Sequence, residues 1–70
     1  MQSIDLIHID AEGYDFRILK SIDFRKWQPK VIIFETDWIT LYEMKEARKL
    51  LTHQGYSIYI SGIDCIAIKK

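Results

Sequence analysis

Acidic side chains follow a short apolar segment near the start of the chain, within residues 4–13 (IDLIHIDAEG). Asp10 and Glu12 lie two residues apart directly before Gly13, and His8 lies two residues before Asp10. In an open α/β sheet, ligands bind outside the carboxyl ends of the strands. Carboxylates at a strand end can orient a substrate hydroxyl or accept its proton. This segment is therefore the first candidate site.

A second apolar segment, residues 30–35 (KVIIFE), also ends in an acid, Glu35, and Asp37 follows closely. If the two segments are neighbouring parallel strands, their carboxyl ends share one edge of the sheet, and Glu35 lies beside Asp10 and Glu12. Hard cations prefer carboxylate oxygens, so a small metal-dependent enzyme is one interpretation of this cluster. The structural alternative is that strand ends meet solvent, where acids are common and cap local turns.

Each candidate residue of the first segment also has a structural interpretation. Asp10 could be the N-cap of a following helix, because its side-chain oxygen accepts backbone N–H groups two or three residues later. Glu12 suits the first turn of a helix through the helix dipole, and Gly13 allows a tight bend. His8, if it points inward, is a hydrogen-bonded core histidine. The residues alone leave these alternatives open.

Apolar spacing predicts the first elements that position these residues. Residues 4–10 alternate between two largely apolar faces, which is typical of a buried parallel strand. After Gly13, helical spacing predicts a helix of about two turns. Its apolar positions are Tyr14, Ile18, Leu19 and Ile22. Asp23 is expected to cap a further turn that ends before Pro29, and residues 30–35 are expected to form a central strand.

The second half of the chain carries clear helix and hairpin signals. Residues 40–43 have the Thr-x-x-Glu form of a capping box, which predicts the start of a helix. Its predicted apolar stripe is Leu41, Met44, Ala47, Leu50 and Leu51. Gly55 is expected to be the left-handed cap at the end of this helix. Residues 56–60 and 65–68 are expected to pair as an antiparallel hairpin around a turn at 61–64.

The composition and the order of these elements, β-α-β-α-β-β, indicate one small α/β domain, residues 1–70. The chain has 70 residues, one cysteine, one proline and a formal net charge of zero. This balance offers no basic stripe for nucleic acid and no polybasic segment for a membrane. No apolar run approaches the length of a bilayer span, and the first residues lack a cationic signal sequence. The expected location is therefore cytoplasmic, with Cys65 as a reduced core residue.

The first acidic block resembles the FkbM family of S-adenosylmethionine-dependent methyltransferases. Residues 4–15, followed by Ile18, Leu19 and Lys20, are similar to the family's lysine-x-Asp-x-Glu-Gly segment with its following acid and leucine-lysine pair. His8 stands where the family usually has lysine. The resemblance implies that Asp10 and Glu12 are catalytic, holding or deprotonating the acceptor hydroxyl. It further implies that His8, Gly13 and Glu35 contact the acceptor substrate.

The resemblance also implies a cofactor that this chain is not expected to bind alone. The full-length family uses S-adenosylmethionine, and its amino-terminal half carries a glycine-rich cofactor loop and an acid that binds the ribose. Gly13, Gly55 and Gly62 are the three glycines of this chain, and no pair of them has the spacing of such a loop. The chain is thus expected to be the carboxyl-terminal half of an O-methyltransferase. A non-catalytic oligomeric remnant and a small metal-dependent enzyme are the alternatives.

The implied Rossmann-like topology predicts a partner. The strands would lie in the order first, second, fourth, third, as a mixed four-stranded sheet whose two crossovers run in one direction. Since crossovers are right-handed, both helices then cover the same face of the sheet. The other face is apolar but uncovered, and the first strand is an unpaired edge. We expect either a missing amino-terminal half or a second copy of the chain to pair with this edge and face.

Overall fold

The structure is a computed structural model that describes residues 5–10, 14–37 and 39–70. Its elements follow the predicted order β-α-β-α-β-β. They are β1 (Leu6–Ile9), α1 (Asp15–Ser21), β2 (Val31–Glu35), α2 (Leu41–His53), β3 (Tyr56–Ser61) and β4 (Asp64–Lys69). Within these described ranges, no helix is both long and apolar enough to cross a membrane.

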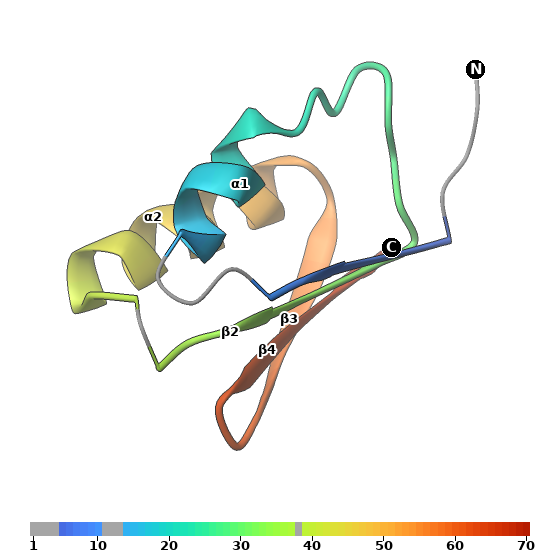
Figure 1. Cartoon of the computed structure of the whole chain (residues 1–70). Helices are drawn as coiled ribbons and strands as arrows, with labels where there is room; N and C mark the ends of the chain where they lie inside the picture. The colour runs from blue at the N-terminus through green and yellow to red at the C-terminus, as the bar shows by residue number, and fades with distance from the viewer. Residues whose placement is uncertain (1–4, 11–13, 38) are drawn as a thin grey trace.

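The four strands form one mixed sheet in the order β1-β2-β4-β3, which confirms the predicted topology. β1 and β2 are parallel, whereas β4 is antiparallel to both β2 and β3. Both helices lie on the same side of the sheet, as predicted (Figure 1). The strand side chains buried beneath them are Ile9, Ile32, Phe34, Cys65 and Ala67, together with Tyr56 at the start of β3.

The helices contribute a smaller set of core residues than their spacing predicted. In α1 the buried apolar residues are Phe16 and Leu19, whereas Tyr14 and Ile18 are exposed. The predicted stripe of α1 was therefore partly wrong. Tyr14 precedes the helix as its N-cap residue, and the short helix turns the face of Asp15, Phe16 and Leu19 toward the sheet. In a helix of only two turns, contacts with the sheet decide which side chains face the core.

Both hydrogen bonds of the capping box predicted at the start of α2 are present. The Thr40 hydroxyl oxygen accepts the backbone N–H of Glu43 at 3.1 Å, and the Glu43 carboxylate accepts the backbone N–H of Thr40 at 3.0 Å. Ala47 and Leu51 of the predicted stripe are buried, but Leu41 is 92% exposed because it lies in the first turn, away from the core. Gly55 has a φ of +89°, which is the left-handed conformation expected after the helix.

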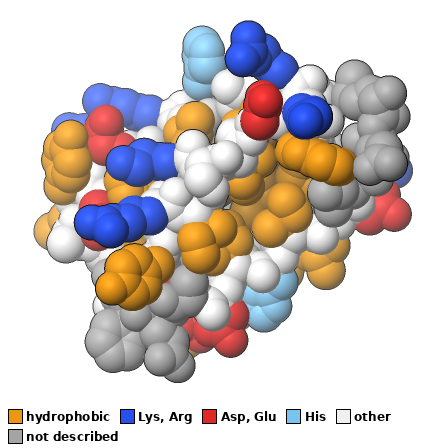
Figure 2. All heavy atoms as spheres, turned by 45° about the horizontal axis from the view of Figure 1, so that its top comes forward, with side chains coloured by type: hydrophobic (Ala, Val, Ile, Leu, Met, Phe, Trp, Pro, Cys, Tyr) orange, Lys and Arg blue, Asp and Glu red, His pale blue; other side chains and the backbone are white. Residues whose placement is uncertain are grey.

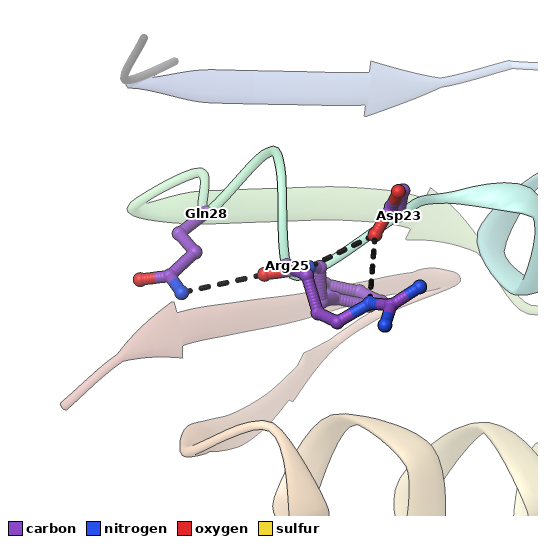
Figure 3. A network of polar contacts seen from close by, with 4 residues as sticks. Asp23, Arg25 and Gln28 are labelled. Atoms are coloured by element: carbon purple, nitrogen blue, oxygen red, sulfur yellow. Dashed lines mark hydrogen bonds and ion pairs between the residues drawn. The ribbon is translucent and has the colours of Figure 1, made fainter. Parts of the chain in front are cut away.

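The turn that follows α1 is also capped as predicted (Figure 3). The Asp23 carboxylate accepts the backbone N–H of Arg25 at 3.1 Å, and the Asp23 carbonyl oxygen accepts the N–H of Trp27 at 2.8 Å. The Gln28 side chain donates to the carbonyl oxygen of Phe24 at 3.3 Å. These bonds close the loop that carries the chain from α1 back to the start of β2.

The side of the sheet opposite the helices is uncovered by the described residues. The strand register places its side chains in rows that run across the sheet. One row is Leu6, Val31, Ile68 and Ser57, and the next is His8, Ile33, Ile66 and Tyr59. His8 is exposed in this second row, so the interpretation of His8 as a core histidine was wrong. The outer edge of β1 also pairs with no strand in the described part of the chain.

Candidate functional site

Three carboxylates line one end of the uncovered sheet face, and we call them the acid row: Asp10, Glu35 and Asp64. Ile9 of β1 lies opposite Phe34 of β2, so the next residue of each chain segment brings Asp10 beside Glu35. On the other side of β2, Glu35 pairs directly with Asp64 of β4. The acids that end the two apolar segments predicted that Asp10 and Glu35 would meet, and the parallel register of β1 and β2 places them at one strand end. Asp64 was not predicted, because its position depends on β4 lying next to β2.

Glu35 lies in the middle of the acid row, and its pKa is shifted by desolvation and by the neighbouring acids. Its partial desolvation, followed by the negative charges of Asp10, Asp15, Asp64 and Asp37, raises the pKa of Glu35 above its usual 4.5. A carboxylate with a raised pKa holds a proton more firmly than an ordinary glutamate. Glu35 is therefore the stronger proton acceptor that a general base requires.

Asp15 lies on the helical side of the same strand end. It is the first residue of α1, its side chain is fully buried, and its Oδ2 accepts the backbone N–H of Glu35 at 3.3 Å. Its Oδ1 is buried without a hydrogen-bond partner among the described residues. The sequence predicted no site role for Asp15. The signal for its burial is the four-residue spacing from Asp15 to the buried Leu19, which puts both on one helix face.

The remaining predicted site residues differ in how the structure places them. Glu12 and Gly13 lie outside the described residues. Asp10 does not cap α1, whose N-cap residue is Tyr14 and has no side-chain capping bond. His8 lies on the uncovered face, one row away from the acid row, beside Ile33. Asp10 and Glu35 are thus brought together, with His8 two strand positions before Asp10.

The chemistry that these groups support is hydrogen bonding and proton transfer. Among residues 5–10, 14–37 and 39–70, no group of three or more histidine, cysteine or acidic side chains is arranged to hold a metal ion. Burial raises the pKa of the Cys65 thiol to about 11, which disfavours a thiolate nucleophile. A carboxylate row can accept hydrogen bonds from hydroxyl groups and take up a proton from one of them.

Comparison with protein families identifies the chain. Residues 1–58 match the family model described as the methyltransferase FkbM domain. The chain belongs to the FkbM methyltransferase family. The match to this FkbM domain runs from before β1 into the first residues of β3, so Asp10 and Glu35 fall inside it and Asp64 lies beyond it. Neither the curated proteins nor the solved structures gave a match to this FkbM chain.

A pH titration of stability tests the electrostatics of the acid row. Since the pKa of Glu35 is raised in the folded state, the folded chain holds this proton more tightly than the unfolded chain. The stabilisation that this Glu35 proton adds to the free energy of unfolding is fully present below pH 4.5, and it is lost as the pH rises through the folded pKa. Glu35→Gln is therefore expected to remove part of this decline and to be more stable than the parent at pH 7. Thermal unfolding between pH 4 and 7 measures this, with Glu46→Gln on α2 as a matched control. If Glu35→Gln changes the stability by the same amount at every pH, so that the decline with rising pH remains, Glu35 does not cause that decline.

Proposed function

We propose that this chain is the acceptor-binding, carboxyl-terminal portion of an FkbM-type O-methyltransferase. The observation that carries the proposal is the acid row, which lies at the carboxyl ends of the first two parallel strands of a methyltransferase-family chain. Ligands of open α/β sheets bind at this end of the strands. In this proposal Asp10 accepts a hydrogen bond from the acceptor hydroxyl and orients its oxygen. Glu35 or Asp10 takes up the hydroxyl proton as the oxygen gains a methyl group, while the carbon–sulfur bond of the sulfonium donor would break and release a neutral thioether.

The cofactor is proposed to bind elsewhere than on these residues. S-adenosylmethionine is the methyl donor that the FkbM family implies. Of the described glycines, Gly55 follows α2 and Gly62 lies in the β3–β4 turn, so neither belongs to a strand-to-helix loop that could cradle a cofactor. The described residues therefore do not fit this group. The chain is proposed to supply the acceptor side of the reaction and not to bind the cofactor alone.

The uncovered sheet face supports a proposal about the partner. Large apolar side chains stay exposed there, including Leu6, Tyr59 and Ile68, at 54%, 56% and 42% respectively. The open edge of β1 adjoins this face. We propose that an amino-terminal half of an FkbM domain pairs with β1 and covers the face. Self-association of a non-catalytic chain is the competing explanation of the same surface.

Calorimetry and light scattering on the purified chain test these statements. With millimolar S-adenosylmethionine we expect no heat of binding and no thermal shift from the chain alone. After addition of a separately expressed amino-terminal FkbM half that carries the glycine-rich loop, we expect a one-to-one complex that binds the cofactor. Cofactor binding by the isolated chain would contradict the proposal that this chain binds only the acceptor. A chain that stays monomeric at high micromolar concentration and does not bind the added half would contradict the proposed partner.

The role of Asp10 is tested in the reconstituted complex with radiolabelled methyl donor and hydroxyl acceptors. Asp10→Asn keeps the side-chain shape and is expected to slow methyl transfer at least tenfold, because general-base and orienting groups contribute about that much or more. Asp5→Asn is the matched control, since Asp5 is exposed just before the opposite end of β1. Equal rates for the two variants would remove Asp10 from the mechanism.

A further inference from the structure

A groove on the helical side of the molecule lies between α1 and α2. Its volume is about 510 Å³, within the range of about 300–1,000 Å³ that is typical of small-molecule sites. Residues four apart on α1 form one wall, and one face of α2 forms the other. The lining residues are Phe16 and Lys20 from α1, and Tyr42, Glu46, Lys49, Leu50 and His53 from α2. The groove lies on the opposite side of the sheet from the acid row, so it is separate from the site described above.

The groove combines apolar surface with an aromatic wall. Phe16 is 7% exposed and packs into the core, and Leu50 is half-buried against the same core. Tyr42 also lines the groove and is 70% exposed. A ligand with a flat apolar body can therefore bury its surface on Phe16 and Leu50 while it contacts the Tyr42 ring.

The rim of the groove carries more positive than negative charge. Lys20 lies over the floor, with its Nζ 4.8 Å from the centroid of the Phe16 ring. Lys49 lines the groove from α2 and pairs at 3.4 Å with Glu46, the one acid among the described lining residues. A second, shallower hollow shares Lys49 and His53 with the groove. Arg48 and Thr52 line that second hollow beside the groove.

Figure 2 looks onto this side of the molecule and shows Lys and Arg side chains at the left of the view, together with acidic and hydrophobic ones. The described lining of the groove has two lysines and one glutamate, so it keeps a net positive charge. Charge complementarity thus selects an anion, and the volume selects a small molecule. S-adenosylmethionine, which carries a sulfonium cation, is a poor match to this rim.

We propose that the α1–α2 groove binds a small organic anion, namely an apolar or aromatic body that bears one carboxylate, sulfonate or phosphate group. The body lies on Phe16 and Leu50, and the anionic group lies between Lys20 and Lys49. This proposal does not rest on the proposed methyltransferase function, because no residue of the groove belongs to the acid row.

The test uses 8-anilinonaphthalene-1-sulfonate as the anionic probe and N-phenyl-1-naphthylamine as its uncharged counterpart. Backbone amide shifts in a ¹H–¹⁵N titration are expected to move at Phe16, Lys20 and Leu50. The uncharged probe is expected to bind at least threefold more weakly than the sulfonate. The expected loss is about two- to fivefold for Lys20→Gln and for Lys49→Gln, the range that one exposed charge pair supplies.

One variant is expected to change the affinity in the opposite direction. Glu46→Gln removes the acid that pairs with Lys49 in the groove, so the sulfonate should bind about two- to fivefold more tightly. Because 8-anilinonaphthalene-1-sulfonate also binds the exposed apolar surface of partly unfolded chains, this gain is measured from the shifts of the Phe16, Lys20 and Leu50 amides in a spectrum that keeps the dispersion of the folded parent. Lys26→Gln, which changes a lysine outside both hollows, is the matched control and should leave the affinity unchanged.

Three results would overturn the proposal. The first is equal affinity for the charged and uncharged probes. The second is amide shifts at Ile33, Tyr59 and Ile66, which would place the probe on the uncovered sheet face instead. The third is a parent affinity that does not fall when sodium chloride is added, since an exposed charge contact is screened by salt.

Discussion

Ile32→Ala is expected to destabilise the chain by about 2–5 kcal/mol, whereas the same replacement at the next residue, Ile33→Ala, should cost only about 1 kcal/mol. Ile32 is fully buried beneath the helices, and its removal leaves a cavity in the core. Ile33 points to the uncovered face, where it is only partly buried. A domain of this size has a total stability of roughly 4–10 kcal/mol, so Ile32→Ala brings it close to unfolding.

Urea unfolding followed by circular dichroism measures both values at low micromolar concentration, where association is weakest. The two variants remove the same atoms from adjacent positions of β2, so each is the control for the other. Equal costs in a monomeric sample would contradict a core that lies on one side of the sheet. A cost of Ile33→Ala that grows with protein concentration would instead report on a partner that covers this face.

Tyr56→Phe is expected to cost about 1–3 kcal/mol, although it removes a single oxygen atom. Tyr56 is 1% exposed, and its hydroxyl donates to the carbonyl oxygen of Pro29 at 2.6 Å. This bond ties the start of β3 to the loop before β2. Without the hydroxyl, the buried carbonyl of Pro29 loses its donor, while the edge contact between the ring and Phe24, at 5.9 Å between centroids, is kept.

Tyr59→Phe is the control, because Tyr59 lies on the same strand but is 56% exposed. We expect it to change stability by no more than about 0.5 kcal/mol. The pH dependence gives a second measurement. Burial raises the pKa of Tyr56 above 10.0, so the stability of the parent falls as the pH rises above 10.0 and through the folded pKa. This part of the alkaline decline should be missing from Tyr56→Phe, and its persistence would show that Tyr56 does not cause it.

The two polar regions of this small fold lie on opposite sides of the sheet. The acid row lies on the uncovered face at the strand ends, and the cationic rim lies over the helices. The zero net charge of the chain therefore includes a local excess of acids at the strand ends and a local excess of lysines at the groove. Because the two regions share no residue, each proposal is tested by its own mutations.

Much of the fold could be predicted from residues 5–70 because its signals are local. The capping box at Thr40 and Glu43 specifies a helix start through bonds within four residues. The alternating segments around Gly62 specify a hairpin through a two-residue turn. The acids at the ends of two apolar segments predicted that Asp10 and Glu35 would meet, because parallel strands bring like ends together.

By itself, the sequence determined the order of the elements, the caps of α2, the turn at Asp23 and the family, since each depends on spacing along the chain. Only the tertiary structure decided which side chains those elements bury. The phase of α1 is fixed by contacts with the sheet, and this buries Asp15 and exposes Tyr14 and Ile18. Asp64 joins the acid row because β4 inserts between β2 and β3. The groove exists because α1 and α2, which β2 separates in the chain, pack side by side. These outcomes depend on residues far apart in the chain, which short-range periodicity cannot encode.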